Sequence, residues 1–150
     1  MPYLQAVYWD LDGTIANTEL EAHLPAFNNS FKDLSLDWYW DKKTYLDLLK
    51  INGGRNRISF FAKLKSVDIS EDFVIQIHKK KQEHYLDLVS SGVVSLKIGV
   101  QRLINHLSSF NVRQFIVTSS SRIQVQLLIS KLFCDKNPFE FFISSDDVDC

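Results

Sequence analysis

Three short apolar segments of the chain each end in a polar loop, and this repeated pattern restricts the fold more than any other feature of the sequence. The segments span residues 4–9, 112–117 and 139–143, and helical patterns follow the first two. Apolar runs of this length, bounded by turn residues, are typical of buried strands. Strands separated by helices predict a parallel sheet, whose ligands bind beyond the carboxyl ends of the strands. We therefore expect an α/β fold in which the three polar loops meet at one edge of the sheet.

The connection between the first two predicted strands is long and mostly helical. One face of a predicted helix is marked by four apolar residues, Leu20, Leu24, Phe27 and Phe31. A later helix is expected over residues 71–88, and a glycine-containing break interrupts the helical pattern at residues 50–57. Residues 89–97 are the expected return path to the sheet. The sequence thus predicts a helical insertion within a sheet-forming domain.

Composition and charge narrow the possible functions. The chain has 150 residues, of which 45% are hydrophobic and 23% charged, as in soluble globular domains. Its net charge of -1 provides no general attraction for nucleic acid or anionic membranes. Charged residues interrupt every apolar run before membrane-spanning length, and the first residues lack a signal-peptide pattern. Cys134 and Cys150 fit neither a zinc site nor a disulfide framework. We expect a cytoplasmic monomer that binds neither nucleic acid nor membrane.

Two aspartates directly follow the first predicted strand, in the run Asp10, Leu11, Asp12, Gly13, Thr14. An extended backbone at the strand end would project both carboxylates into one loop, and Gly13 permits a sharp turn. One carboxylate could then attack a substrate while the other transfers protons. Two anions so close together favour a divalent cation, and Mg²⁺ typically binds one or two carboxylates with water and phosphate oxygens. The alternative interpretation is an ordinary Asp-Gly turn.

Hydroxyl groups follow the second predicted strand. Thr118, Ser119, Ser120 and Ser121 offer hydroxyl and backbone N–H groups at a helix start, where a phosphate binds favourably. Ser and Thr are also the preferred residues for capping a helix, which is the alternative interpretation. Because this loop and Asp10 should lie at the same sheet edge, we predict a phosphate site between Asp10 and Thr118 with Mg²⁺ alongside.

These motifs resemble the haloacid dehalogenase superfamily of phosphatases, with residues 10–14 as the first motif and Thr118 as the second. Residues 17–31, 36–41 and 49–57 resemble more narrowly the CbbY-like sugar phosphatases. The resemblance implies a Rossmann-like core formed by residues 1–15 and 89–150. It also implies that residues 16–88 form an all-helical cap that closes over the substrate and excludes water.

The resemblance assigns roles to the two aspartates. Asp10 would be the nucleophile that forms an aspartyl-phosphate, and Asp12 the general acid and then the general base. Mg²⁺ would bind Asp10 and the backbone carbonyl of Asp12. Since a dehalogenase has no leaving-group oxygen to protonate, an acid at Asp12 favours phosphoryl transfer. A phosphotransferase resembling beta-phosphoglucomutase shares both aspartates and remains an alternative.

The CbbY-like resemblance also implies a substrate, xylulose-1,5-bisphosphate, an inhibitory by-product of carbon fixation in the Calvin cycle. A bisphosphate requires a second anion site, and Lys50, Arg55 and Arg57 are chemically suited to it beside the flexible Gly54. The alternative is a solvated basic turn. The implied location is the cytoplasm, or the plastid stroma in a photosynthetic eukaryote.

Three further residues are candidates for substrate binding. Glu19 and His23 lie one helical turn apart just after the first motif, where they could bind sugar hydroxyls or simply face solvent. Arg122 follows the serine loop and could reach the substrate or cap its own helix. The sequence leaves both interpretations of the Glu19 and His23 pair open, and both interpretations of Arg122.

The chain departs from the family pattern in one respect. The family uses a lysine that bridges nucleophile and phosphate, and a later acidic motif that completes the Mg²⁺ site. Neither is found in this sequence. The tail at residues 145–150 resembles the segment just before that lysine. We therefore expect a fragment with weak or no activity, in which Asp146 and Asp147 lead into the missing motif or act as a substitute metal ligand. A non-catalytic domain that binds phosphate or a partner, through the aromatic region 38–45, is the competing function.

Overall fold

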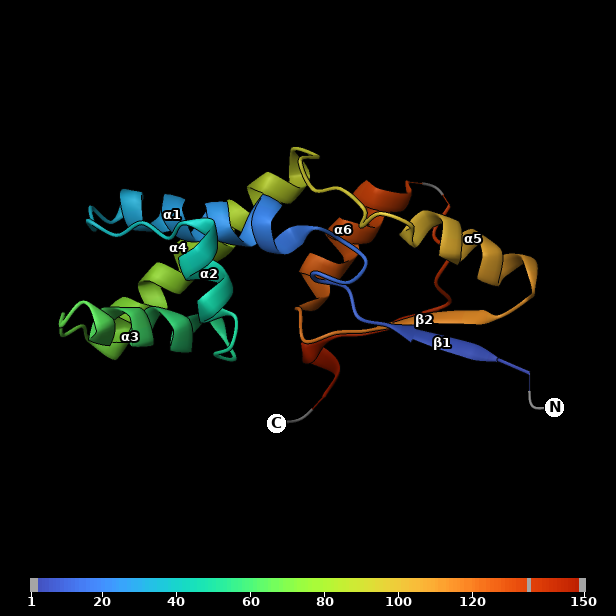
Figure 1. Cartoon of the computed structure of the whole chain (residues 1–150), viewed down its shortest axis with the longest axis horizontal. Coiled ribbons are helices and arrows are strands. Elements are labelled where there is room, and N and C mark those ends of the chain that lie inside the picture. The colour runs from blue at the N-terminus through green and yellow to red at the C-terminus, as the bar shows by residue number, and fades with distance from the viewer. Residues whose placement is uncertain (1–2, 135, 149–150) are drawn as a thin grey trace. The chain divides into compact units, whose positions relative to one another are not determined.

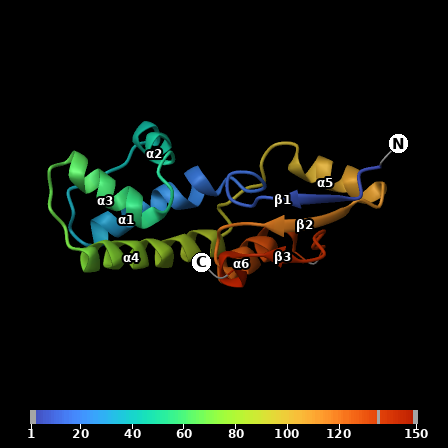
Figure 2. The same ribbon diagram turned by 90° about the horizontal axis from the view of Figure 1, so that it is seen from below.

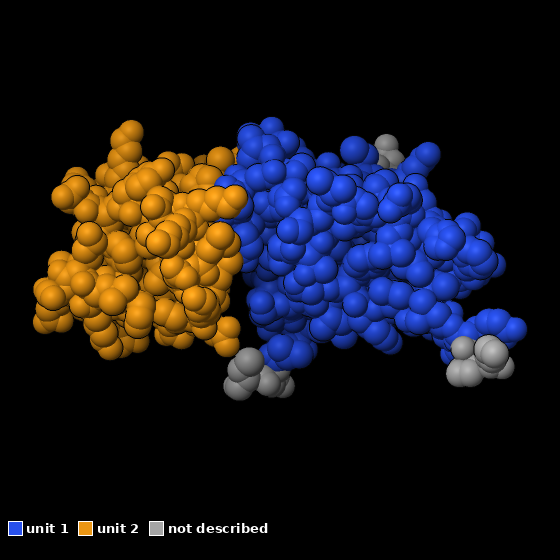
Figure 3. Space-filling view, viewed as in Figure 1, with its two compact units in different colours: residues 1–21, 89–150 blue, residues 22–88 orange. Residues whose placement is uncertain are grey.

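The computed structural model describes residues 3–134 and 136–148, so Cys150 lies outside the described residues. Contacts divide the chain into two compact units, residues 1–21 with 89–150 and residues 22–88 (Figure 3). No helix of the described residues is long and apolar enough to cross a membrane. Each unit is built around its own core and is described separately.

The first unit contains a parallel sheet, as the sequence predicts. Its strands are β1 (Ala6–Trp9), β2 (Arg113–Val117) and β3 (Phe142–Ile143), in the order β1-β2-β3 (Figure 1). Tyr8 pairs with Phe115 in the register between β1 and β2. The sheet order places β1 at one edge, where it pairs with β2 alone among the described strands.

Helices α5 (Val100–Ser109) and α6 (Arg122–Phe133) both lie on one face of this sheet (Figure 1). The chain crosses from β1 to β2 to β3 in a constant direction, and right-handed crossovers then place their helices on the same side. The side chain of Gln114 in β2 fixes α5 to this face by donating to the backbone oxygen of Ile104 at 3.1 Å. On the same face the ring of Phe142 lies 5.5 Å from the guanidinium of Arg122 in α6.

The opposite face of the sheet is open in the described residues. Tyr8 is 65% exposed, Phe141 is 48% exposed and Val117 is 43% exposed. Tyr8 and Phe141 flank the buried ring of Phe115, with ring centroids 5.2 Å and 4.5 Å away. We predicted residues 4–9 as a buried strand, but only the face carrying Trp9 is buried, because no helix among the described residues covers the other face.

The second unit is a small helical domain with an aromatic core. Its helices are α1 (Leu24–Asp33), α2 (Lys42–Leu48), α3 (Gly54–Leu64) and α4 (Glu71–Ser90), and α4 runs beside α1 (Figure 1, Figure 2). Trp40 is fully buried, with its ring 4.5 Å from Phe27 and 5.0 Å from Phe31. Of the four aromatic side chains in region 38–45, only Tyr39 is exposed, so most of its aromatic rings form core rather than a surface for partners.

Side-chain interactions fix the loops of the second unit. Asn28 of α1 binds both the backbone N–H and the backbone oxygen of Trp40, at 2.8 Å and 2.9 Å. Asp41 caps α2 by accepting a hydrogen bond from the N–H of Thr44 at 2.7 Å. These hydrogen bonds hold the extended segment before α2 against the aromatic core.

Residues 16–21 pack with the first unit, although the sequence analysis assigned them to the cap. The backbone N–H of Asn17 donates to the backbone oxygen of Ser95, and the carboxylate of Glu21 accepts hydrogen bonds from the N–H and hydroxyl of Ser95. A π-helix over Glu19–His23 then leads into α1. These hydrogen bonds join the segment that leads out to the insertion to the segment that returns from it.

Candidate active site

The first loop of the site is a tight turn after β1 that fixes two aspartates. The backbone oxygen of Leu11 accepts from the N–H groups of Ile15 and Ala16, both at 3.0 Å. Gly13 has a φ of +73°, a conformation that L side chains rarely adopt. The hydroxyl of Thr14 donates to the carboxylate of Asp10 at 2.8 Å. Asp10 is exposed at the end of the strand and is thus held in place while open to a ligand.

The second loop, after β2, meets the first. The hydroxyl of Ser120 donates a hydrogen bond to the carboxylate of Asp12. Thr118 anchors the loop, because its N–H donates to the backbone oxygen of Ile143 at 3.0 Å and its hydroxyl accepts from the N–H of Ser120 at 3.2 Å. The structure therefore brings the Asp12 and Thr118 loops together at the carboxyl edge of the sheet. Ser120 was not singled out as a ligand of Asp12 by the sequence.

Helix capping in this loop is performed by Ser121. Its backbone N–H and hydroxyl both donate to the side-chain oxygen of Gln124 at 3.1 Å, so Ser121 and Gln124 form a capping box for α6. Thr118 and Ser119 precede this cap in the chain. The alternative interpretation, helix capping, therefore applies to Ser121 and not to the hydroxyl groups of Thr118 and Ser119.

The third loop, after β3, is tied to the second. The N–H of Ser145 donates to the backbone oxygen of Ser120 at 3.0 Å, and Asp146 accepts from the N–H of Arg122 at 2.8 Å. The guanidinium of Arg122 forms an ion pair with Asp147. Hydrogen bonds from the hydroxyl and N–H of Ser144 lower the pKa of Asp147. Asp146, Asp147 and Arg122 thus join the loop to α6, and all three loops meet at one sheet edge.

The predicted pair of Glu19 and His23 is divided between the two units. Glu19 belongs to the first unit, where a Cβ on Gly13 would lie 3.4 Å from its Cγ. His23 belongs to the second unit, and its ring stacks on Tyr85 with centroids 4.4 Å apart. Its Nδ1 lies 2.7 Å from the ammonium nitrogen of Lys81. The two residues therefore have different surroundings despite their spacing of one helical turn.

Lys81 is the central residue of a cationic cluster in the second unit. Its side chain is only 4% exposed, and its ammonium lies 5.2 Å from the centroid of Phe27 and 4.9 Å from that of Tyr85. Sequence analysis missed this residue. The available signal was its position four residues after Ile77 and four before Tyr85, on the apolar stripe of α4.

His78 lies beside this cluster. Burial, and after it the charges of Lys81, Arg55 and His23, together lower its pKa to about 4. A Cβ on Gly54, the first residue of α3, would lie 2.8 Å from two ring atoms of His78. The absence of a side chain at Gly54 therefore allows the start of α3 to approach the His78 ring. The local field of the cluster is positive, and Arg55 contributes to it.

The other two predicted phosphate ligands make local interactions. The Nε of Arg57 donates to the backbone oxygen of Ile51 at 2.8 Å, which closes the loop before α3. Lys50 forms an exposed ion pair with Asp47 at 2.9 Å. Among the three cations suggested by the sequence, Arg55 is the one whose charge acts on His78.

A family model described as haloacid dehalogenase-like hydrolase matches residues 7–150. This chain belongs to that family. The haloacid dehalogenase-like core explains the parallel strands and the position of the aspartate loop at their carboxyl ends, in agreement with the fold inferred from the sequence.

Two relatives and one solved structure illustrate the similarity within this family. Protein CbbY of Rhodobacter capsulatus is 35% identical over 147 residues, covering 97% of this chain and 64% of the relative. The CBBY-like protein of Arabidopsis thaliana is 28% identical over 151 residues, covering 95% and 47%. CbbY from Rhodobacter sphaeroides, solved in complex with phosphate, is 32% identical with a TM-score of 0.81, covering 97% of this chain and 65% of that one. The chain spans about half to two thirds of these proteins.

The Mg²⁺ that the haloacid dehalogenase resemblance implies fits the first loop. Asp10 and Asp12 provide oxygen ligands, and Mg²⁺ needs only one or two protein carboxylates when water and phosphate supply the rest. No group of three or more His, Cys, Asp or Glu side chains suited to a metal occurs within residues 3–134 and 136–148. This chain would therefore supply the Asp10 carboxylate and the Asp12 backbone oxygen, and few other protein ligands.

Proposed function

We propose that this chain carries the nucleophile and the substrate-binding groups of a phosphatase that hydrolyses a small sugar bisphosphate. The observation that carries the proposal is the contact between the loops after β1 and β2, where Ser120 binds Asp12. Within the first loop, Thr14 binds Asp10 at the same sheet edge. The arrangement suits attack on a phosphorus atom.

In the proposed reaction, a carboxylate oxygen of Asp10 attacks phosphorus while the sugar oxygen leaves with a proton from Asp12. Asp12 then accepts a proton from a water molecule, whose oxygen attacks the aspartyl-phosphate and releases inorganic phosphate. Thr14 orients Asp10, and Ser120 holds Asp12. Mg²⁺, when bound, neutralises charge on the phosphate oxygens.

A bisphosphate substrate is supported by the cationic cluster of the second unit. Lys81, Arg55 and His23 concentrate positive charge there, and the start of α3 offers further N–H groups. A mutant of CbbY from Rhodobacter sphaeroides, 31% identical and with a TM-score of 0.81, was solved in complex with xylulose-(1,5)bisphosphate. We therefore propose xylulose-1,5-bisphosphate as the first substrate to test.

Phosphate release from this compound tests the reaction. We expect Mg²⁺-dependent release of inorganic phosphate by the purified chain, because Mg²⁺ would offset the negative charge of the phosphate and of Asp10. Asp10→Asn preserves shape but removes the nucleophile, so it should abolish release. Release that continues in Asp10→Asn or in excess chelator would contradict the proposed mechanism.

A second measurement tests the bisphosphate specificity. Lys81→Met removes the buried charge with little change of volume, whereas Lys79→Met alters an exposed lysine on the same helix. We expect Lys81→Met to weaken binding of the bisphosphate at least tenfold and binding of xylulose 5-phosphate much less, with Lys79→Met unchanged. Equal weakening of both ligands would argue against a second phosphate site at Lys81.

A further inference from the structure

One polar side chain interrupts the apolar core of the first unit. Gln114 lies within β2 and is 2% exposed, beside the buried Phe115 and Ile116. Strands of parallel sheets are normally apolar, because helices cover them. A buried amide is usually retained in a core only when its hydrogen-bonding groups have partners. The partners of Gln114 therefore show what this residue holds in place.

The amide oxygen and nitrogen of Gln114 both have hydrogen-bond partners. The oxygen accepts from the indole N–H of Trp9 at 3.1 Å. The nitrogen donates to the backbone oxygen of Ile104 at 3.1 Å and to the hydroxyl of Ser108 at 2.9 Å. A side-chain amide nitrogen has two hydrogen atoms to donate, and both are used here. Gln114 thus joins β1, β2 and α5 through one amide group whose orientation is fixed.

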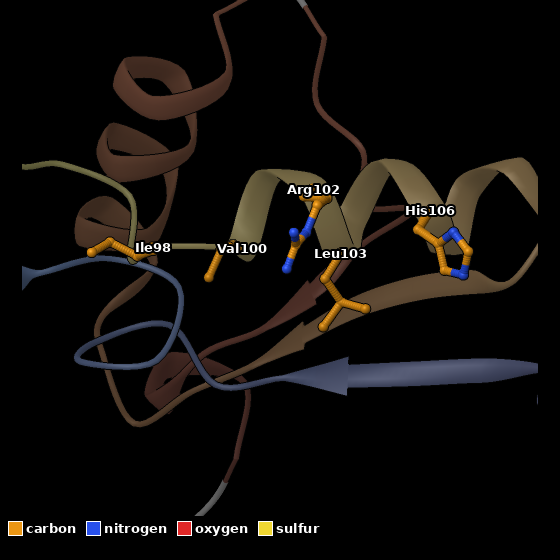
Figure 4. A pocket seen from close by; sticks show the side chains of 6 residues that line it. Ile98, Val100, Arg102, Leu103 and His106 are labelled. Carbon is orange, nitrogen blue, oxygen red and sulfur yellow. The ribbon is translucent and has the colours of Figure 1, made fainter.

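The helix α5 has one side in this network and another side in solvent. Ile104, whose backbone oxygen Gln114 binds, is 1% exposed. Arg102, Leu103 and His106 of the same helix are exposed and line a hollow of about 520 Å³ (Figure 4). The hydrogen bonds of Gln114 therefore hold α5 on the side that packs against the sheet.

The other end of the network is Trp9, the last residue of β1, which directly precedes Asp10. Val7 is the register partner of Gln114, and Trp9 follows two residues later on the same face of the strand. The side chain of Trp9 is buried. Its hydrogen bond to Gln114 thus runs diagonally across the sheet to the end of β1. This bond restrains the backbone at the point from which Asp10 extends.

A hydrogen bond at this position has an effect that apolar packing lacks. The hydrophobic effect depends on the area buried and has no preferred direction. Replacing both partners of a buried hydrogen bond by apolar groups of the same shape can be nearly neutral for stability. The bond between Trp9 and Gln114 therefore contributes more to position than to net stability. Position matters for a nucleophile, because a displacement of about 1 Å can lower a reaction rate about 100-fold.

We propose that Gln114 and Trp9 are positioning residues for Asp10. Their hydrogen bond holds the end of β1 against α5, so that the Asp10 carboxylate approaches phosphorus in line with the leaving sugar oxygen. Thr14 restrains this carboxylate within the loop, and Gln114 restrains the preceding backbone from the core. The inference rests on the proposed function for the reaction of Asp10, but the placement of Asp10 by the network can be measured without that reaction.

Three variants test the role in catalysis. Trp9→Phe keeps an aromatic ring but removes the N–H, Gln114→Met keeps the approximate shape but removes the amide, and the double variant removes both. We expect kcat for phosphate release from xylulose-1,5-bisphosphate to fall about tenfold in each single variant, with KM almost unchanged. The double variant should fall no further, since all three lack the same hydrogen bond. The matched control is Gln101→Met, which changes an exposed glutamine of α5 and should leave kcat unaltered.

Backbone relaxation measured by NMR provides a readout that does not require activity. The order parameter of the Asp10 amide should be about 0.85, as in rigid backbone, in the unaltered chain and in Gln101→Met. It should be lower in Gln114→Met. If the unaltered chain releases no phosphate, the proposed function fails, and the order parameter of Asp10 alone decides whether the network positions this residue.

Several results would contradict the inference. An unchanged kcat in Gln114→Met, or losses that multiply in the double variant, would show that Trp9 and Gln114 do not act through their hydrogen bond. A raised KM with unchanged kcat would assign them to substrate binding instead. An unchanged order parameter at Asp10 would show that the network does not restrain it.

The stability of the variants separates positioning from a purely structural role. The double variant leaves neither partner of the Trp9–Gln114 bond unpaired, so it should keep the fold even if a single variant does not. Circular dichroism at the assay temperature gives the folded fraction of each variant. A loss of kcat that disappears after correction for this fraction would overturn the positioning role.

Discussion

The two units of this chain contain similar kinds of residues but differ in how completely they bury them. In the second unit, Phe27, Phe31 and Trp40 pack against one another with almost no exposure. In the first, Tyr8 and Phe141 flank Phe115 and remain about half exposed. Helices that wrap around a shared core can enclose it within about 70 residues, whereas a parallel sheet needs a helical layer on each face. Aromatic content alone therefore does not indicate which unit has a closed core.

The largest expected effect concerns the closed unit. Trp40→Ala would leave a cavity between Phe27, Phe31 and Phe61, so we expect the free energy of unfolding of this unit to fall by about 3–5 kcal/mol. Tyr8→Ala at the open face should change stability by only about 0.5 kcal/mol. Denaturation followed by hydrogen exchange at residues 22–88 measures the first effect. Equal effects of the two substitutions would contradict the comparison.

A smaller effect depends on pH. The pKa of His78 is about 4 in the folded chain, below its ordinary value of 6.5, so the unfolded state binds more protons between these values. The stabilising contribution is therefore present above pH 6.5 and is lost as the pH falls toward 4. We expect a loss of about 1–2 kcal/mol, less than the full shift implies, since solvent screens the half-buried ring.

His78→Gln is the matched variant for this prediction. It keeps a polar side chain beside Gly54 but cannot titrate, so its stability should vary less with pH between 6.5 and 4 than that of the unaltered chain. Thermal unfolding at several pH values provides the measurement. An unchanged pH profile in the variant would show that another group causes the loss.

The smallest effect is expected at the surface of the first unit. Arg113 forms a bidentate ion pair with Glu140, with nitrogen–oxygen distances of 2.9 Å and 2.8 Å. Both side chains are exposed, so Arg113→Gln should lower the melting temperature only slightly, and less than either of the preceding changes. The difference in stability between the unaltered chain and the variant should shrink in high salt. A loss greater than that from Trp40→Ala would reverse the ranking of the units.

Sequence reasoning identified the sheet and the polar loops at its carboxyl edge because these depend on local patterns. A short apolar run followed by Asp10 and Gly13 specifies a strand and a turn within a few residues. The exposure of Tyr8 was not predictable in this way, since a run such as residues 4–9 looks the same whether one face or both are covered. Burial of such a strand depends on segments distant in the chain.

The cations of the second unit also separate what local sequence patterns specify from what tertiary packing decides. Lys50, Arg55 and Arg57 are equivalent in the sequence, yet Arg57 binds the backbone oxygen of Ile51 and Lys50 pairs with Asp47. The buried cation is Lys81, and its environment depends on how α4 packs against α1, which the sequence does not specify. Tertiary packing therefore decides which positive charges are available to a ligand.

The position of Lys81 between two aromatic rings also gives the protein an intrinsic spectroscopic label. Protons on the last carbons of its side chain lie within the ring currents of Phe27 and Tyr85, so their NMR signals should be displaced upfield from those of the solvated lysines. Any anion that draws the ammonium away from the rings would move these signals back toward ordinary values. Ligand occupancy of the cluster can thus be followed at a single residue, in the unaltered chain and without catalysis.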